Sequence, residues 1–519
     1  MRHPLHHILF LVFALCEWVF TGYAIAATPT DIGDASGTPD SPADEPLLEY
    51  GLPPWLLYLA AQQQPPYDPN APCQGSESYP ERLFLQQVGP DSAIIKWRDG
   101  DDPTMGAYQI CFGTDPHLLP RSSRKYATYT ELGHREVVLS GLTPDTLYYY
   151  SVGGAGTAQV TRAFRTAPEV GSLPSDGNTR VWIVGDSGVG GYVPSRIGSA
   201  EVRDGLYSWL AAGDQEPVDL FLMLGDNAYN NGTDVEHQGA IFDVYPTLLE
   251  GAALWPTIGN HEMGSGGGSR SSNPASYSSY TETGLMPYLD IFTLPQGAEV
   301  GGVASGTEQY YSFDYGTVHV VSLDSQLAMR DSGQRAAMKQ WLIDDLEANT
   351  GHWTIVIFHH PPYTKGSHDS DVGTGNDRPI TLIREEFTPV FEDYGVDLAF
   401  SGHSHIYERS YYLNGHRGLS TTFSAAEHAE LYDGSPASGQ GDEVYQQITS
   451  TGFDDKVVYT VAGNGGKLSG TSSGYPHAAH FYSSNARLGS VVVDAGANLL
   501  VARFIDTDGN EYDYYEIAR

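Results

Sequence analysis

The sequence predicts an all-β domain followed by a larger α/β domain of layered architecture. Its 519 residues allow two to four domains. Short strand-like runs separated by turns occupy residues 78–168, and from residue 178 short apolar runs alternate with helical patterns. Hydrophobic residues make up 40% of the chain, which is enough to bury a sizeable core and excludes wholesale disorder.

Residues 1–26 have the pattern of a secretory signal peptide. Arg2 and nearby histidines precede an apolar run, Ile8–Cys16, and Ala24-Ile25-Ala26 offers small residues for cleavage. Glu17 interrupts the apolar run, which makes it too short for a spanning helix. We therefore expect a secreted or periplasmic protein without a membrane span, with a membrane anchor as the alternative.

Residues 27–77 are rich in Pro, Ser, Asp and Gln, which is typical of a linker. Once the signal peptide is removed, Cys73 and Cys111 are the cysteines that remain. In an oxidising compartment they could form one disulfide that ties the linker to the next domain. Two unpaired thiols are the alternative, because the sequence gives no distance between the two residues.

The chain is strongly acidic. It carries 27 Lys and Arg residues against 64 Asp and Glu residues, a formal net charge of −37. Such a chain has no general electrostatic attraction for nucleic acid or anionic lipid, so we expect neither as a partner. A phosphate group would need a local positive centre, for which a bound metal is the obvious candidate.

The strand-like runs of residues 78–168 are spaced as in a β-sandwich of about 90 residues. Trp97 is expected in its core, and Leu139–Tyr148 resembles the corner before a late strand of fibronectin type III domains. The segment has no cluster of titratable residues, so a packing or spacing role is expected rather than catalysis. The runs are Arg82–Val88, Ser92–Trp97, Ala107–Phe112, Glu136–Leu139, Leu147–Val152 and Ala163–Arg165.

Residues 178–519 have the pattern of an α/β domain. Arg335–Ala348 has the apolar rhythm of a helix, while residues 263–280 and 415–455 have the composition of a loop and an insertion. Several short, β-rich apolar runs are typical of strands buried on both faces. These runs are Arg180–Val184, Leu220–Leu224, Ile355–Phe358 and Leu398–Phe400.

Five fragments share one design, in which an apolar strand runs into a tight turn that carries potential metal ligands. Loops at the carboxyl ends of strands in open α/β sheets converge on one crevice, so we expect the five to form one site. The fragments are Gly185-Asp186-Ser187-Gly188, Gly225-Asp226-Asn227-Ala228-Tyr229, Gly259-Asn260-His261-Glu262, Val356-Ile357-Phe358-His359 and Gly402-His403-Ser404-His405.

These residue types suit two adjacent cations. A carboxylate can bridge two metals, histidine nitrogen suits zinc and iron, and a tyrosine phenolate favours a hard, oxidised metal such as Fe(III). Two metals ~3.5–4 Å apart can activate a water molecule and hold both ends of an in-line displacement at phosphorus. The fragments therefore predict phosphoryl-group hydrolysis at a binuclear metal site.

The order of the five fragments resembles that of the calcineurin-like metallophosphoesterases. Tyr229, three residues after Asp226, narrows the resemblance to the purple acid phosphatase family. The resemblance covers most of residues 78–516 and implies a four-layer αββα domain behind a fibronectin type III-like sandwich. Further stretches that resemble the family are Tyr310–Asp314, Val318–Ser325, His405–Ser410 and Tyr459–Gly466.

The resemblance also implies the role of each ligand. The first metal would be Fe(III), and the second would be a divalent Fe, Zn or Mn ion. The ligands so implied are Asp186, Tyr229 and His405 for the first metal, Asp226 as the bridge, and Asn260, His359 and His403 for the second.

Two histidines are expected to act on the substrate. His261 follows Asn260 and would face the phosphate, where it would stabilise negative charge or protonate the leaving group. The family has a further histidine in the loop after the fourth fragment, which His368 matches. His360 is the alternative, but adjacent residues at a strand end usually point in opposite directions, which favours His368.

The activity expected is hydrolysis of small phosphate monoesters by a metal-bound hydroxide, that is, acid phosphatase activity. A phosphodiesterase or nucleotidase on the same site is the alternative. A non-enzymatic secreted protein for metal binding or adhesion is an alternative of another class. His261 and ligands that leave coordination positions open argue against the latter. The oligomeric state stays open.

Overall fold

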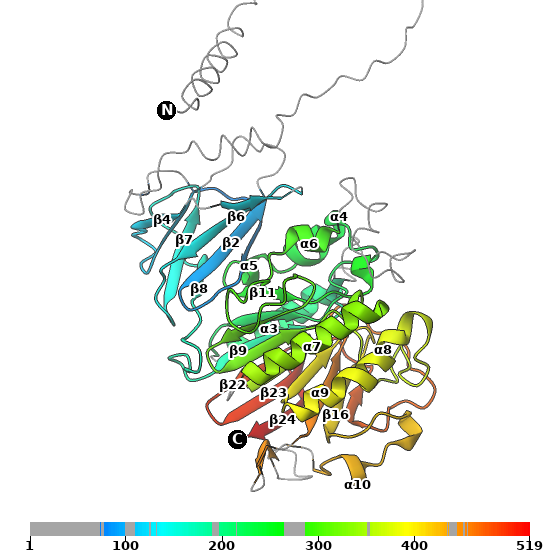
Figure 1. Ribbon diagram of the computed structural model, residues 1–519. Helices are drawn as coiled ribbons and strands as arrows, with labels where there is room; N and C mark the ends of the chain where they lie inside the picture. Colours follow the sequence, from blue (N-terminus) through cyan, green and yellow to red (C-terminus); the bar gives the residue numbers. More distant parts are fainter. Residues whose placement is uncertain are drawn as a thin grey trace, which may run out of the picture. The chain divides into compact units, whose positions relative to one another are not determined.

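The computed structural model (Figure 1) describes most of the chain after residue 72. All described residues lie in one compact unit, Pro66–Arg519. The predicted signal peptide, and the predicted linker apart from Cys73 and Glu77, lie outside the described residues. The described residues are 73, 77–98, 109–123, 126–130, 132–188, 197–213, 215–263, 286–349, 353–432, 434, 444–449, 452–453 and 455–519.

The N-terminal domain consists of two antiparallel sheets, as the sequence predicts. Trp97, on β2 (Ser92–Arg98), is fully buried, as expected. One sheet has the order β4-β3-β7-β8, with β3 (Ile110–Gly113), β4 (Arg121–Ser123), β7 (Leu147–Val152) and β8 (Ala163–Arg165). The strands of the other are β1 (Glu81–Gln86), β2 (Ser92–Arg98), β5 (Tyr126–Tyr129) and β6 (His134–Ser140).

The second of these sheets continues into the larger domain. Strand β1 pairs in parallel with β11 (Ala253–Pro256), and Leu85 lies opposite Ala253. The result is one 11-stranded sheet, β17-β24-β23-β22-β9-β10-β11-β1-β2-β6-β5. Its other strands are β9 (Thr179–Val184), β10 (Leu220–Met223), β17 (Tyr445–Gln446), β22 (Gly489–Ala495), β23 (Leu499–Asp506) and β24 (Glu511–Ala518).

A 7-stranded sheet faces the first, in the order β12-β13-β14-β15-β20-β16-β21. Its central strands β13, β14, β15 and β20 are parallel. A separate hairpin joins β18 (Ile448–Thr449) and β19 (Gly452–Phe453). The seven strands are β12 (Tyr311–Tyr315), β13 (Val318–Ser322), β14 (Trp353–Ile357), β15 (Leu398–Ser401), β16 (Tyr407–Leu413), β20 (Val457–Ala462) and β21 (His480–Ser484).

Helices cover the outer faces of both sheets, which gives the predicted αββα layers. Helix α3 (Ile197–Gly213) packs on β22 and β23 of the first sheet. Helix α7 (Ser332–Ala348) lies beside α8 (Arg378–Leu382) and α9 (Thr388–Asp393) over the second sheet (Figure 1). Short helices in the connections are α4 (Asp234–His237), η2 (Gln238–Phe242), α5 (Pro246–Leu249), α6 (Pro287–Ile291), η6 (Ala328–Arg330), η8 (Ile383–Phe387), η9 (Ser420–Thr422) and α10 (Ala425–His428).

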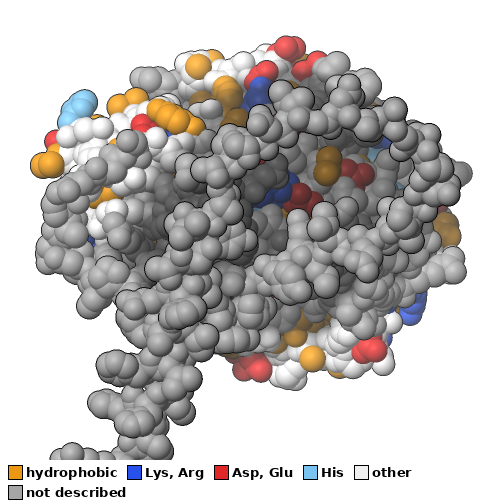
Figure 2. Space-filling model, turned by 90° about the horizontal axis from the view of Figure 1, so that it is seen from above, with side chains coloured by type: hydrophobic (Ala, Val, Ile, Leu, Met, Phe, Trp, Pro, Cys, Tyr) orange, Lys and Arg blue, Asp and Glu red, His pale blue; other side chains and the backbone are white. Residues whose placement is uncertain are grey.

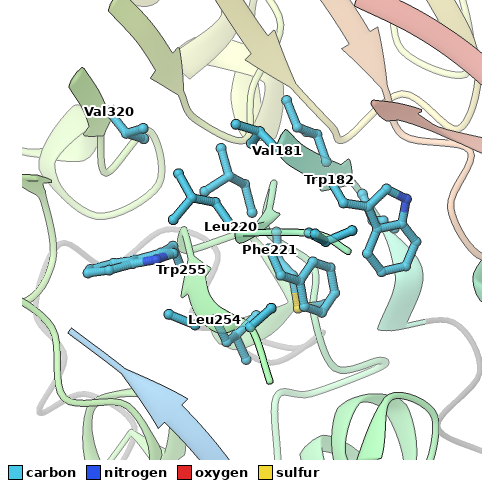
Figure 3. Close-up of a cluster of buried hydrophobic side chains, with 14 of the residues drawn as sticks. Val181, Trp182, Leu220, Phe221, Leu254, Trp255 and Val320 are labelled. Atoms are coloured by element: carbon cyan, nitrogen blue, oxygen red, sulfur yellow. The ribbon is translucent and has the colours of Figure 1, made fainter. Parts of the chain in front are cut away.

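The parallel strands that lead to the predicted site are buried on both faces (Figure 3). On one face Trp182 of β9 stacks on Phe221 of β10, with ring centroids 4.6 Å apart. On the other face Trp255 of β11 stacks on Phe313 of β12 in the opposite sheet, at 3.7 Å. Aromatic packing on both faces fixes the strands, and hence the loops at their carboxyl ends.

The structure joins Cys73 and Cys111 in a disulfide, so the first of the two alternatives for these residues holds. Among the described helices, none combines the length and the apolar character needed to cross a bilayer. Among the coloured atoms in Figure 2, single basic side chains lie next to acidic ones.

Two arginines of the N-terminal domain bind the first residue of α4. Arg82 of β1 has a fully buried side chain, and it donates hydrogen bonds to the carboxylate and the backbone oxygen of Asp234. Arg98 of β2 donates to the other carboxylate oxygen at 2.8 Å. Because α4 directly follows the loop that carries Tyr229, these contacts tie the N-terminal domain to that loop.

Arg82→Ala should therefore destabilise the protein. We expect the free energy of unfolding to fall by about 2 kcal/mol, less than the ~3–5 kcal/mol of a fully buried pair, because Asp234 keeps Arg98 and is partly exposed. Urea unfolding of the full chain would measure it. Arg165→Ala is the control, because both partners of its pair with Asp145 are partly exposed, unlike the fully buried Arg82, and the pair should contribute roughly 0–1 kcal/mol. Equal losses in the two variants would contradict the expectation.

Candidate metal centre

The five loops meet where strands of the two sheets end. Strands β9, β10 and β11 belong to the first sheet, and β14 and β15 to the second. Asp186, Asp226 and His403 have φ values of +54°, +51° and +66°, in the left-handed region that is costly for residues other than glycine. The residues brought together are Asp186, Asp226, Tyr229, Asn260, His359, His403 and His405.

One half of the site surrounds the hydroxyl oxygen of Tyr229. This oxygen lies 2.9 Å from Asp186 Oδ1, 2.9 Å from Asp226 Oδ2 and 3.0 Å from His405 Nε2. A phenol has a single proton, which can serve only one of the two carboxylates. Burial and the neighbouring Asp186 and Asp226 carboxylates raise the pKa of Tyr229 well above its usual range. This half of the site is therefore rich in lone pairs and short of positive charge.

The other half surrounds the side-chain oxygen of Asn260. This oxygen lies 3.0 Å from His359 Nε2 and 2.8 Å from His403 Nδ1. His359 Nδ1 lies 2.9 Å from the Leu224 carbonyl oxygen and so carries a proton, which leaves Nε2 as the nitrogen that faces Asn260 and Asp226. Burial opposes a charge on His359, yet the Asp226 carboxylate raises its pKa to about 9. Without a cation, Nε2 therefore also holds a proton, whose place a bound cation would take.

Asp226 belongs to both halves. Its Oδ2 atom contacts the Tyr229 hydroxyl at 2.9 Å and lies 3.3 Å from His359 Nε2. Asp226, His359 and His403 can direct one ligand atom each to a common point. A donor set of carboxylate, phenol and imidazole on one side, and of amide and imidazole on the other, fits two cations with Asp226 between them.

Glu262 lies in the third fragment, and its sequence position alone did not indicate a role in the site. Its buried carboxylate accepts hydrogen bonds from backbone N–H groups of two loops, and this joins the loop after β10 to the loop after β11. Burial and the Asp226 carboxylate raise its pKa to about 8. A carboxylate directly after Asn260-His261 is the signal that could have identified it. The donors are Asp226, Asn227, Ala228 and Gly259.

His261 lies at the partly exposed rim of the site, with 26% of its side chain exposed. Its backbone N–H donates to Asp226 Oδ1 at 2.7 Å, and its ring lies against Tyr229 with centroids 4.2 Å apart. His261 Nδ1 lies 2.8 Å from the Asn230 carbonyl oxygen and so carries a proton. Nε2 is therefore the nitrogen available to a substrate.

His368 and His360 both lie against His403, in different environments. His368 stacks on His403 with centroids 3.7 Å apart, and 32% of its side chain is exposed. The His360 ring is fully buried, and its Nδ1 atom lies 2.9 Å from the Ser325 hydroxyl. Of the two, His368 is the one that a substrate can reach.

Two further polar residues contact the predicted ligands and were missed in the sequence. Asp377 Oδ1 lies 3.1 Å from His403 Nε2, and Ser469 Oγ lies 3.0 Å from His405 Nδ1. Ser469 stands in a loop and Asp377 ends the short helix η7 (Gly375–Asp377), and neither residue belongs to one of the five fragments. No local pattern marks them, because only the folded chain brings them to the imidazoles.

Comparison with known families covers both domains. Residues 179–407 match the family model of calcineurin-like phosphoesterases. Residues 80–166 match the model of the purple acid phosphatase N-terminal domain. The two matches follow each other along the chain in the order that the resemblance implies.

Curated relatives include plant purple acid phosphatases. Purple acid phosphatase 15 of Arabidopsis thaliana is 24% identical over 382 residues, 64% of each chain. An uncharacterized protein of Mycobacterium tuberculosis is 28% identical over 355 residues, 63% of this chain and 61% of the relative. The chain thus spans less than two thirds of the length of these relatives.

Solved structures support the fold. The purple acid phosphatase from yellow lupin (Lupinus luteus) seeds superimposes with a TM-score of 0.59 at 16% identity, covering 86% of this chain and 75% of the plant chain. The structure of PhoD gives a TM-score of 0.54 at 13% identity, covering 85% of this chain and 90% of PhoD. The chain therefore has the metallophosphoesterase fold behind a purple acid phosphatase N-terminal domain, and it resembles the purple acid phosphatases over both.

Proposed function

We propose that the protein is a secreted or periplasmic phosphatase that hydrolyses small phosphate monoesters at a binuclear metal centre. The observation that carries this proposal is the pair of acceptor-rich clusters that share Asp226. His261 and His368, both partly exposed, stand beside them. A site for structural metals needs no such reachable acid–base groups at its rim.

The proposed cofactors are Fe(III) and a divalent Fe, Zn or Mn ion. When bound, the two cations would supply a nucleophile from water and offset the negative charge of the phosphate. Asp186, Tyr229 and His405 would hold the first, Asn260, His359 and His403 the second, and Asp226 both.

Two histidines of the chain would stabilise charge and donate a proton. His261, whose Nδ1–H is held by the Asn230 carbonyl group, would in its imidazolium form donate from Nε2 to a phosphate oxygen and offset its charge. His368 would give a proton to the leaving oxygen as its bond to phosphorus breaks.

Export is supported by the Cys73–Cys111 disulfide, because such bonds persist in oxidising compartments. The proposed segments are 1–26 (signal peptide), 27–77 (linker), 78–168 (fibronectin type III-like domain) and 178–519 (catalytic domain).

One assay separates the candidate functions. Purified protein is given p-nitrophenyl phosphate and bis-p-nitrophenyl phosphate, and the metal content of the same sample is measured. Faster hydrolysis of the monoester supports the proposal, and faster hydrolysis of the diester favours a phosphodiesterase. Metal-loaded protein that hydrolyses neither ester would favour a non-enzymatic metal-binding protein.

If the Tyr229 phenolate binds the proposed iron, the protein should absorb visible light. A phenolate bound to Fe(III) absorbs visible light by charge transfer, so iron-loaded protein should be coloured and Tyr229→Phe should lose the band. Tyr150→Phe is the matched control, because Tyr150 is a buried phenol of the N-terminal domain that donates to the Glu250 carbonyl oxygen. Absorption spectra with iron analysis measure the outcome. A colourless iron-loaded wild-type protein would rule out the tyrosine–iron assignment.

A further inference from the structure

One carboxylate oxygen contacts two histidines of the site. Asp377 ends the short helix η7 (Gly375–Asp377), directly before α8. Its Oδ1 atom lies 3.0 Å from His368 Nδ1 and 3.1 Å from His403 Nε2. The two imidazole rings stack at an interplanar angle of 27°. The three side chains thus form one compact group at the rim of the site.

These contacts decide which nitrogen of each ring carries a proton. A carboxylate accepts hydrogen bonds, so His403 Nε2 and His368 Nδ1 both carry protons that point at Asp377. His403 Nδ1 is then left with its lone pair directed to the side of Asn260, where the second cation is proposed. His368 Nε2 is left as the nitrogen that can meet a substrate. A carboxylate behind a ligating histidine generally fixes its tautomer and ring orientation.

The backbone near His368 is fixed by other contacts. Lys365 Nζ binds Asp369 at 2.6 Å and Asp371 at 2.8 Å, within the same loop. The Ser367 hydroxyl accepts a hydrogen bond from the His405 backbone N–H at 3.0 Å. Within the described part of the chain, Asp377 is the residue to which the His368 ring is hydrogen-bonded. Removing the Asp377 carboxylate should therefore release this ring without unfolding the loop.

We propose that Asp377 is a positioning residue that orients both the proposed acid, His368, and the proposed ligand of the second metal, His403. The inference rests on the proposed function. In the step it serves, the bond from phosphorus to the leaving oxygen breaks and its electron pair stays on that oxygen. The oxygen takes the proton that the imidazolium form of His368 carries on Nε2, which leaves the ring neutral. Water supplies the new oxygen on phosphorus and loses its proton to the solvent. Asp377 keeps Nδ1 protonated and pointing away throughout.

The first test uses leaving groups of different quality. A poor leaving group depends on proton donation, whereas p-nitrophenolate leaves with little help. On the full, metal-loaded chain, Asp377→Asn should lower kcat ~10²-fold for glycerol 2-phosphate and less than ~10-fold for p-nitrophenyl phosphate. Asp377→Glu should recover part of the loss. Asp369→Asn is the matched control, because it removes the same charge from a carboxylate that binds Lys365 and should not separate the two esters.

The second readout does not depend on activity. Because Asp377 orients His403, Asp377→Asn should weaken retention of the second metal ~10-fold in competition with a chelator. In the His368→Ala variant, adding Asp377→Asn should not change the ratio of the kcat values for the two esters any further. The reason is that the two residues would act as a unit. An equal loss on both esters together with unchanged metal retention would overturn the proposal. If the wild type hydrolyses neither ester, the proposed function fails, and the chelator experiment still decides the role of Asp377 at His403.

Discussion

Asp226→Asn is expected to lose both metals and the hydrolytic activity together. Asp226 Oδ2 contacts Tyr229 on one side and approaches His359 on the other, so both proposed cations depend on its charge. Two adjacent cations repel each other unless anionic charge lies between them. Loss of several kcal/mol of transition-state stabilisation corresponds to a fall of ~10³-fold or more in kcat. Metal analysis and turnover on the same sample measure both effects.

The backbone around Asp226 should survive the substitution, because Glu262 binds the surrounding N–H groups independently. Asp219→Asn is the matched control, because Asp219 directly precedes β10 and so lies at the end of the strand opposite the loop that carries Asp226. Burial raises the pKa of Asp219 to about 7, so a neutral side chain resembles a form that it already adopts easily. This control should keep both metals. Two metals and full turnover in Asp226→Asn would show that the carboxylate does not bridge.

The convergence of the five fragments could be predicted because its cause is local. Each fragment joins a buried strand to a tight turn, and parallel strands present their carboxyl ends at the same edge. The carboxyl ends of these strands therefore place Asp186, Asp226 and His359 close together, as the sequence predicts. The helix predicted at 335–348 appears as α7, Ser332–Ala348, because Asp331 caps it through the N–H groups of Gly333 and Gln334.

The remaining features depend on contacts between distant parts of the chain. Pairing of β1 with β11 joins Leu85 to Ala253, and no periodicity in either segment specifies that partner. Asp345 interrupts the apolar face of α7, yet it is buried because it binds His319 and Ser312. The proposed role of Asp377 likewise depends on its contacts with the imidazoles of His368 and His403. Polar residues whose partners lie far away in sequence are the class that pattern analysis misses.

Substitution of the histidines should separate residues that act on substrate from residues that hold metal. His261→Ala is expected to keep both metals and to lower the rate ~10²–10⁴-fold, the range for an acid or a charge stabiliser. Its side chain is partly exposed, and its backbone contact with Asp226 does not need the imidazole. His359→Ala should instead lose the second metal, because the buried Nε2 atom faces Asn260.

Single-turnover rates beside metal analysis distinguish the two classes, and His368 and His360 supply the sharpest comparison. His368→Ala should behave like His261→Ala, because the ring is reachable at the rim and its Nε2 atom is free for the leaving group. His360→Ala should leave the rate within about tenfold of wild type, since the buried ring contacts Ser325 and His403 and adds no proton donor at the rim. A silent His368→Ala together with an inactive His360→Ala would reverse the assignment. In that case the proton for the leaving oxygen would have to come from the buried side of His403, which requires the loop around residues 364–378 to move away from the rim during turnover.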